Sequence, residues 1–497
     1  MTAPAVPIKG PLSGPPAPPH APQASPPSET APGGTLLLSL ILGAAPALAL
    51  AIAVARGGSS NPWVLPLAGI TFIVNAMIVL MDIKNGLALF IITAGLSPKL
   101  PGVYDNLRVE DFIFVMVFGV WLARNLQGRG LPRITSPIVV PFVALTLYSI
   151  FATVWGSGNG MIEDLKYSFF LQAKRIEYFL IFWVVATTVR SEAWLRLLIL
   201  CFVGSGALAS VYGMANPAAA TEGVAETRVV GAEGENYNTL AGYLIICIGV
   251  GLAAMAGFRR FQRTFIIGCT LLSLLAVLFS FSREGYIMLL GTLGVFGFTK
   301  NRSILVVAVL LLLAIGAVVP TVRDNVVDTV GVIQRAPDDD PGSNSLTNRF
   351  RSWEYRWNYW FLKQPLVGCG VGSVALSVDS EYVLRLCEVG VVGFGIFLWW
   401  LGSIWKQVRH LRRVKGMPSV LAVGLAAAFV GMLIQAIVAA SFNSIRTMEP
   451  FWFLLGLVSA AVAIQYRATQ AGSAQGTSAP SPSAPAAPVQ TATACVS

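Results

Sequence analysis

The chain has 497 residues, of which 55% are hydrophobic and only 12% are charged. A soluble globular domain carries about 25% charged residues, so this composition excludes an ordinary soluble enzyme. The formal net charge of +10 would suggest nucleic-acid binding in a soluble protein. Here the arginines and lysines cluster in short stretches between apolar runs, as in membrane proteins, and we expect no nucleic-acid partner.

The two ends of the chain differ in composition from the rest. Residues 1–34 and 468–497 are crowded with Pro, Ala and Ser and contain few large apolar side chains. Such segments bury too little surface to offset the entropy of ordering, so we expect both tails to be disordered. The first apolar run starts too late, and without a basic n-region, to be a signal peptide.

Between the tails, residues 35–467 contain repeated apolar stretches of about 18 residues, which predict transmembrane helices. We therefore predict an all-α polytopic membrane protein with about twelve to fourteen transmembrane helices and one large polar loop, 321–381. The predicted spans are 35–55, 63–81, 85–97, 109–125, 137–155, 175–190, 193–214, 239–257, 264–281, 284–299, 303–320, 382–405, 418–441 and 450–467.

Clusters of basic residues orient these spans. Each cluster follows an even-numbered span, so all of them lie on one face, which the positive-inside rule makes cytoplasmic. Both termini are then cytoplasmic, and the loop 321–381 faces the periplasm. The clusters are Arg124, Arg129 and Arg133; Arg259, Arg260 and Arg263; Lys300 and Arg302; and Lys406, Arg409, Arg412, Arg413 and Lys415.

The cysteines and histidines do not form a metal-binding pattern. The six cysteines show no CxxC spacing, and the two histidines, His20 and His410, lie far from the polar loop. We therefore expect no metal site. Cys369 and Cys387 could pair in an oxidising compartment, but the pattern favours free, small core residues.

Three predicted periplasmic segments carry unusual polar residues. The first is ETRVVGAEGENYNTLAGYL, which includes Arg228 and Asn238. Its asparagines could bind sugar hydroxyls; the alternative, which this segment alone favours, is a polar loop with a helix cap. The second is SFSREGYIMLL, in which Arg283 lies at a tight turn between two spans. An arginine there either pairs with Glu284 or presents its fork of donors to a phosphate or pyrophosphate.

The third segment, TNRFRSWEYRWNYWFLKQP, lies inside the large loop. Arg349, Trp353, Arg356 and Trp360 recur at helical spacing and form one stripe of alternating cations and indoles. The stripe indicates either an interfacial helix anchored among lipid headgroups or a lid over a lipid-linked anionic substrate, with indoles stacked on sugars. The following PLVGCGVGS turn lacks the Lys-Ser/Thr ending of a phosphate loop.

Together, SFSREGYI, NRFRSWEYRWNYWFLKQPLVGCGVGS and DSEYVLRLCEVGVVG resemble the O-antigen ligase and O-antigen polymerase family of bacterial envelopes. The resemblance covers roughly residues 225–405. The family has Arg followed four residues later by Leu; here Ile287 follows Arg283. Its ligases have a His-containing motif with two spaced glycines. The spacing of that motif matches Asp379, Ser380, Gly390 and Gly393 here, and Asp379 takes the place of the His.

The resemblance implies a glycosyltransferase of the bacterial inner membrane that uses an undecaprenyl-pyrophosphate-linked glycan and needs no cofactor or metal. Arg283 would hold the donor pyrophosphate. Asp379 would accept the acceptor hydroxyl proton, with Glu381 as a substitute base. The family also suggests a chain-length regulator and a flippase as partners. The expected substrate-binding residues are Arg228, Asn238, Arg349, Trp353, Arg356 and Trp360.

Several activities remain compatible with this sequence. Asp379 in place of the His favours a surface-polysaccharide polymerase that elongates repeat units. The alternatives are a ligase that transfers glycan to a lipid or protein acceptor, a peptidoglycan-type polymerase, and a lipid-linked oligosaccharide flippase. Transporters bind substrate near the bilayer midplane in broken helices and internal repeats, whereas here the polar residues gather on one face and no repeat is evident.

Overall fold

The structure is a computed structural model that describes residues 64–97, 108–128, 130–217, 228–231, 236–299, 345–374 and 379–476, together with residues 302, 306 and 310. All of these residues fall within one compact unit. The predicted span 35–55, most of the span 303–320 and the loop residues 321–344 lie outside the described residues. So do the predicted N-terminal tail and most of the C-terminal one.

Within the described ranges the chain is helical and has no β-strand, which confirms the predicted all-α membrane fold. Seven helices are long and apolar enough to cross a membrane: α5, α7, α8, α9, α14, α15 and α16. The described α-helices are α2 (Val64–Met81), α3 (Ile83–Ala94), α4 (Val109–Gly128), α5 (Val139–Gly158), α6 (Leu165–Thr188), α7 (Glu192–Ala215), α8 (Tyr237–Ala254), α9 (Arg260–Phe279), α10 (Arg283–Thr299), α13 (Ser345–Tyr359), α14 (Glu381–Leu411), α15 (Met417–Val438) and α16 (Ile445–Gly476).

Each predicted span that lies in the described ranges coincides with a helix, but the start of one helix differs clearly. The sixth span was predicted to begin at residue 175, whereas α6 begins at Leu165. Lys174 and Arg175 made the preceding residues read as a loop. In the structure both side chains are buried and paired with carboxylates, so the helix continues through them.

Small residues let the central helices pack closely. A Cβ atom on Gly249 of α8 would lie 3.2 Å from the Ala428 nitrogen of α15, and a Cβ atom on Gly424 of α15 would lie 3.2 Å from the Val250 Cα atom. The two backbones therefore approach each other directly. Close approach through small residues is the usual way in which membrane helices associate, because lipid provides no hydrophobic driving force between them.

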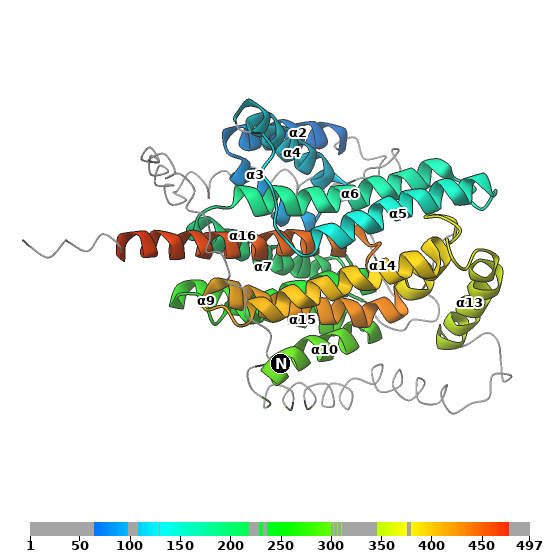
Figure 1. The fold of residues 1–497 in the computed structure, drawn as a ribbon. Coiled ribbons are helices and arrows are strands. Elements are labelled where there is room, and N and C mark those ends of the chain that lie inside the picture. The colour runs from blue at the N-terminus through cyan, green and yellow to red at the C-terminus, as the bar shows by residue number, and fades with distance from the viewer. Residues whose placement is uncertain are drawn as a thin grey trace, which may run out of the picture. The chain divides into compact units, whose positions relative to one another are not determined.

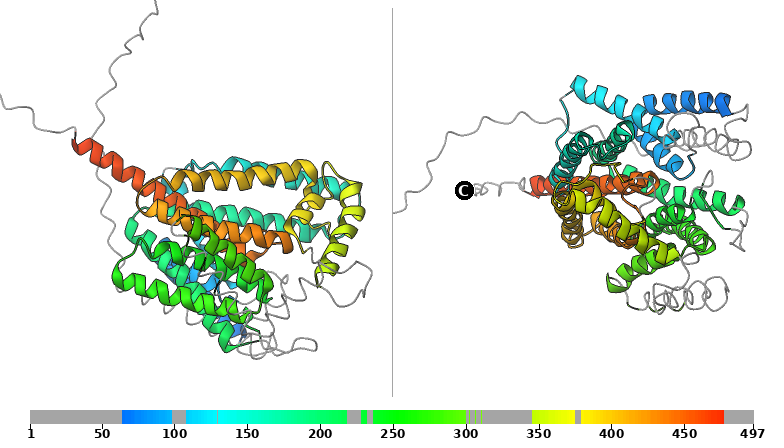
Figure 2. Two further views of the ribbon diagram at one scale, coloured as in Figure 1. Left: turned by 90° about the horizontal axis from the view of Figure 1, so that it is seen from below. Right: turned by 90° about the vertical axis from the view of Figure 1, so that its right-hand side faces the viewer.

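The two ends of the helix bundle are built differently (Figure 1). Helix α13 lies across one end, roughly perpendicular to α14 and α15, and Figure 2 shows the same crossing from another side. We call this the α13 end. At the other end, α14 stops at Leu411, close to Arg412, Arg413 and Lys415, and α16 projects beyond its neighbours. We call this the basic end.

Candidate active site

The hairpin between α9 and α10 contains a strained residue. Phe281 has φ 51°, and it is the one residue other than glycine in the described ranges with a positive φ. A bulky side chain in this region is an outlier, and such strain concentrates at functional sites. Ser282 follows it, accepts a hydrogen bond from the Gly285 N–H at 2.9 Å and donates one to Asn238 Oδ1 at 2.6 Å. The first residue of α10, Arg283, is thereby fixed next to Asn238.

Arg349 of α13 bridges two carboxylates at this hairpin. Its Nη2 atom lies 2.6 Å from Glu284 Oε1, and its Nε atom lies 3.9 Å from Asp379 Oδ2. The Glu284 side chain is only 7% exposed, whereas Asp379 is 44% exposed. Arg283 itself is exposed. The structure thus gives Glu284 a partner on α13. Through Arg349 it links Asp379 with the residue that follows Arg283 in α10.

The stripe on α13 faces the protein. Arg349, Trp353, Arg356 and Trp360 are all half-buried, while the opposite face of the helix, with Arg351, is exposed. A lid over a substrate would have this orientation, and it is compatible with an interfacial position of the helix. Aromatic rings on the flanks of α13 are free to meet lipid, since Phe350 is 60% exposed.

Individual contacts show how two of these side chains are placed. The Arg356 guanidinium donates hydrogen bonds to the carbonyl and hydroxyl oxygens of Ser352, one turn earlier. The Trp353 Nε1–H group is buried and has no hydrogen-bond partner among the described residues. A buried donor without a partner is costly and calls for an explanation, which a ligand hydroxyl would supply.

The glycine-rich turn after α13 fits into a break in α14. Gly390 has φ 63° and ψ −171°, so the helical hydrogen bonds are interrupted there. The Cys369 N–H donates to the Cys387 carbonyl at 2.9 Å, and the Gly370 N–H donates to the Glu388 carbonyl at 2.8 Å. On the other side of the break, the Val391 N–H donates to the Pro365 carbonyl at 2.9 Å. The turn therefore satisfies the backbone groups that the break leaves free.

Glycine is required at the contact because the two backbones touch. A Cβ atom on Gly390 would lie 2.7 Å from the Gly368 nitrogen, and one on Gly368 would lie 2.5 Å from the Gly390 nitrogen. Both residues also have positive φ angles, which side chains rarely adopt. Glycine is thus required at positions 368 and 390 so that the loop can pack against the broken helix.

The sequence from α9 to α14 agrees with this geometry. Residues 268–398 match the family model described as O-antigen ligase. This segment is therefore similar to the O-antigen ligase family. The matched O-antigen ligase segment contains Arg283, Arg349, Asp379 and the break at Gly390, and it lies within the range predicted from the motifs. The chain is therefore a multi-pass membrane protein with a segment similar to O-antigen ligase. A comparison with curated proteins gives no match.

Next to the ion pairs of Arg349 at the α13 end lies a buried ion network that the sequence did not predict. Glu388 Oε2 lies 3.3 Å from Arg175 and 3.2 Å from Arg385, and Glu388 Oε1 accepts the Gly372 N–H at 3.0 Å. The network links α6, α14 and the glycine-rich turn. Charged residues inside predicted spans were the available signal, because such residues are rare unless they are paired or functional.

Glu381, the predicted substitute base, belongs to the same network. Its carboxylate is fully buried, binds Arg385 Nε at 2.6 Å and accepts the Phe442 N–H at 3.1 Å. It thereby connects α14 with the loop before α16. Its catalytic role stays a prediction; the contacts give it a structural role.

A second buried cluster surrounds Lys174. The Nζ atom lies 2.6 Å from Asp111, 3.0 Å from Glu177 and 3.6 Å from Glu449. The three carboxylates lie close enough to one another to hold a metal ion. The Lys174 ammonium contacts each of them, however, and offsets one of their three formal negative charges. The cluster therefore fits an ion-paired tie between α4, α6 and α16.

The remaining predicted residues lie around the hairpin. The Arg228 guanidinium lies over the Tyr237 ring, 4.7 Å from its centroid, and the adjacent Val229 N–H donates to the Phe279 carbonyl at the end of α9. Trp360 packs against the small apolar cluster of Phe361, Val374, Leu384 and Cys387. The structure thus joins Asn238 to Ser282 by a hydrogen bond, and Glu284 and Asp379 to Arg349 by ion pairs. Arg283 lies between Ser282 and Glu284 in the chain.

The described cysteines are all free and buried. Cys369 and Cys387 lie next to each other through their backbones but are not joined by a disulfide. Burial raises the pKa of the Cys369 thiol, while the Lys363 ammonium acts in the opposite direction. A protonated thiol is a poor nucleophile, so this residue contributes to packing.

Proposed function

We propose that this protein is a surface-polysaccharide polymerase that joins undecaprenyl-pyrophosphate-linked repeat units at the α13 end. The observation that carries the proposal is the position of Arg349, which contacts both Asp379 and Glu284, the residue next to Arg283 in the sequence. All of these residues lie in the segment similar to O-antigen ligase. Two arginines suit a pyrophosphate because each offers a planar set of donors to paired oxygens. The carboxylate beside them is exposed enough to meet an acceptor hydroxyl.

The proposed reaction is a single inverting displacement. The acceptor hydroxyl oxygen attacks the anomeric carbon of the donor sugar, and its proton passes to the Asp379 carboxylate. The bond between the anomeric carbon and the pyrophosphate oxygen breaks, and its electron pair leaves with the lipid pyrophosphate. Arg283 stabilises the negative charge that develops on this leaving group. Arg349 is held by Glu284 and Asp379, so it offers a second, oriented cation.

The sugar is expected to lie under α13. The half-buried positions of Trp353 in α13 and of Trp360, directly after α13, support this expectation. The unpartnered Trp353 Nε1–H would donate to a sugar hydroxyl. Asn238, which is held by Ser282, and Arg228 would contact the glycan from the hairpin side.

A ligase is the second candidate, because the matched family model is described as O-antigen ligase. In that case the same donor chemistry transfers the finished glycan to a lipid or protein acceptor. Asp379, where the family's ligases have His, is the feature that favours the polymerase.

The proposed location is the bacterial inner membrane, with the α13 end facing the periplasm and both termini in the cytoplasm. The basic residues at the opposite end of the bundle support this orientation. A flippase that delivers the lipid-linked unit and a chain-length regulator are the proposed partners.

The test uses the full-length protein in liposomes with a short undecaprenyl-pyrophosphate glycan as the sole substrate. Products are sized on a gel for the unaltered protein, Arg283→Ala and Asp379→Ala. Arg351→Ala is the matched control, because Arg351 lies on the exposed face of α13, two residues from Arg349. We expect a glycan ladder that is lost in the first two variants and kept in the control.

Other outcomes would change the assignment. Products that form only after a separate lipid or protein acceptor is added would identify a ligase. A ladder that survives Arg283→Ala would remove the proposed site. A folded protein that forms no product under either condition would point to a transporter of lipid-linked glycan.

A further inference from the structure

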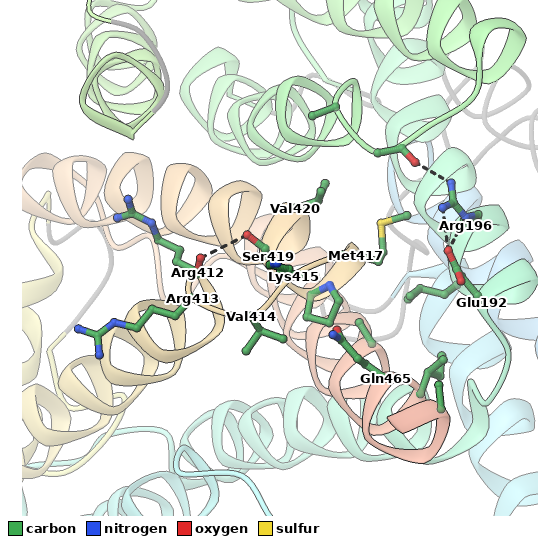
Figure 3. Close-up of a pocket in the computed structure, with 18 residues that line it drawn as sticks. Glu192, Arg196, Arg412, Arg413, Val414, Lys415, Met417, Ser419, Val420 and Gln465 are labelled. Carbon is green, nitrogen blue, oxygen red and sulfur yellow. Dashed lines mark hydrogen bonds and ion pairs between the residues drawn. The ribbon is translucent and has the colours of Figure 1, made fainter. Parts of the chain in front are cut away.

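The basic end contains a pocket, at the end of the bundle opposite to α13 (Figure 3). Its volume is about 670 Å³. The pocket lies between the start of α7, the connection from α14 to α15, and the projecting part of α16. The apolar part of its wall comes from Leu195, Met417, Val420, Ala461 and Ile464.

Positive charge exceeds negative charge around this pocket. Arg196, Arg412, Arg413 and Lys415 line it, together with a single acidic residue, Glu192. The Glu192 carboxylate is already bound by Arg196, with Nη2 at 2.7 Å and Nε at 2.9 Å. The other three cations are exposed and have no ion pair with any carboxylate in the described part of the chain. Their charge is therefore available to an anionic ligand.

The position of each cation decides its role. Figure 3 shows the guanidinium groups of Arg412 and Arg413 pointing away from Met417, so these residues form a charged rim. Arg196 is fixed by Glu192 and by the Gly257 carbonyl, to which its Nη1 atom donates at 2.7 Å. Lys415, beside the start of α15, is the lining cation that remains to contact a ligand inside the pocket.

Helix α15 starts at the pocket and adds to its positive potential. Gly416, with φ 86°, precedes α15, and the Ser419 hydroxyl donates to the Arg412 carbonyl at 3.4 Å, which closes the connection. In the first turn the N–H groups of Met417 and Ser419 have no partner within the helix and lie at the positive end of its dipole, whereas Pro418 between them has no N–H. The Gln465 Oε1 atom at this site is buried without a partner, and a flip of the amide would present its NH₂ group instead.

The pocket also lies at the ends of apolar helices. It is formed where α7 and α15 begin and where α8 and α14 end, which is where a membrane helix meets the bilayer surface. Its basic residues lie above an apolar wall, which matches a phospholipid with a charged headgroup and apolar chains. Basic pockets between membrane helices on the cytoplasmic side are typical binding sites for acidic headgroups.

We propose that this pocket binds the headgroup of an anionic phospholipid. The phosphate lies between Lys415 and the first turn of α15, Arg412 and Arg413 attract it from the rim, and the glycerol and upper acyl chains follow the wall of Leu195, Val420 and Ile464. The site holds a membrane lipid, and it is separate from the site proposed for the glycan donor.

The test measures lipid binding to the full-length protein after detergent purification and delipidation. Native mass spectrometry counts bound lipid during titration with phosphatidylglycerol or with zwitterionic phosphatidylcholine. The variants are Lys415→Gln and Ala468→Trp; the second narrows the pocket from the exposed side of α16 without removing a charge. Arg260→Gln is the control, because Arg260 is exposed at the same end and does not line the pocket.

We expect tight binding of one phosphatidylglycerol molecule, weaker binding of phosphatidylcholine, and an affinity about fivefold lower in Lys415→Gln. Ala468→Trp should lose the same lipid, and Arg260→Gln should keep it. Equal binding of both lipids, or unchanged binding in Lys415→Gln and Ala468→Trp, would overturn the proposal. Displacement of the lipid by millimolar glycerol phosphate would assign the site to a soluble phosphate compound instead.

Discussion

The α13 end and the basic end of the bundle differ in the burial and the pairing of their basic side chains. At the α13 end, Arg175, Arg349 and Arg385 are buried or half-buried and bound to carboxylates, as in the contact between Arg349 and Glu284. At the basic end, Arg412, Arg413 and Lys415 are exposed and have no acidic partner among the described residues. Buried, paired charge fixes geometry, whereas exposed charge acts through its field and is screened by salt. The first arrangement suits catalysis and the second suits a membrane surface.

The largest effect should come from Arg283, because it is the exposed arginine of the strained hairpin. Removing a group that stabilises a departing anion typically lowers turnover about 10²–10³-fold. We expect Arg283→Ala to lose about that much and Arg283→Lys to recover part of it, since lysine keeps the charge but not the fork of donors. Initial rates of glycan extension in liposomes would measure both. Equal rates for the two variants would show that the fork is not used.

The next largest effect should be on stability, at Glu388. Glu388→Ala leaves Arg175, Arg385 and the Gly372 N–H without their shared acceptor. Breaking a buried ion pair from one side costs about 3–5 kcal/mol. Thermal unfolding in detergent should therefore show a clear loss, whereas Glu354→Ala, on the exposed face of α13, should not. Similar melting temperatures for the two variants would show that the network does not stabilise the fold.

A smaller effect on activity should follow from the contact between α13 and the hairpin. Arg349→Ala and Glu284→Gln each break the same 2.6 Å ion pair, and we expect each to slow polymer formation about tenfold. Side chains that act as a unit give non-additive losses. The double variant should thus be about as active as the worse single variant. Losses that multiply would show that the two residues act independently.

The smallest effect should occur at the basic end. Arg409→Gln neutralises an exposed cation that neither lines the pocket nor forms an ion pair in the part of the chain described. Surface substitutions of this kind usually change stability by less than about 0.5 kcal/mol. Melting temperature and glycan extension should both stay close to those of the unaltered protein. A large loss of either would mean that exposed charge at this end also supports the fold or the chemistry.

The sequence predicted the features of this fold that depend on neighbouring residues. Hydropathy located the helices, and the spacing of Arg349, Trp353, Arg356 and Trp360 predicted that they share one face of a helix. The family motifs also marked Gly390, although its break in α14 was not expected.

The features that the sequence did not predict depend on distant contacts. Arg175 and Glu388 are separated by 213 positions, and Arg349 and Glu284 by 65. The predicted sixth span began at Arg175 and left Lys174 in a loop, because the partners of these residues on other helices could not be predicted from local composition. The sequence analysis considered only Glu284 or a phosphate as a partner for Arg283. In the structure, Glu284 pairs with Arg349 of α13.

The break at Gly390 also affects how this protein can be recombined with its relatives. The residues of α14 before the break are bonded to the turn that follows α13, through the Cys369 and Gly370 N–H groups. The turn that begins at Pro365 and the part of α14 up to Val391 are therefore one hydrogen-bonded unit, called here a cassette. A chimera joined at the start of α14 would divide this cassette, whereas junctions before Pro365 and after Val391 would exchange it intact.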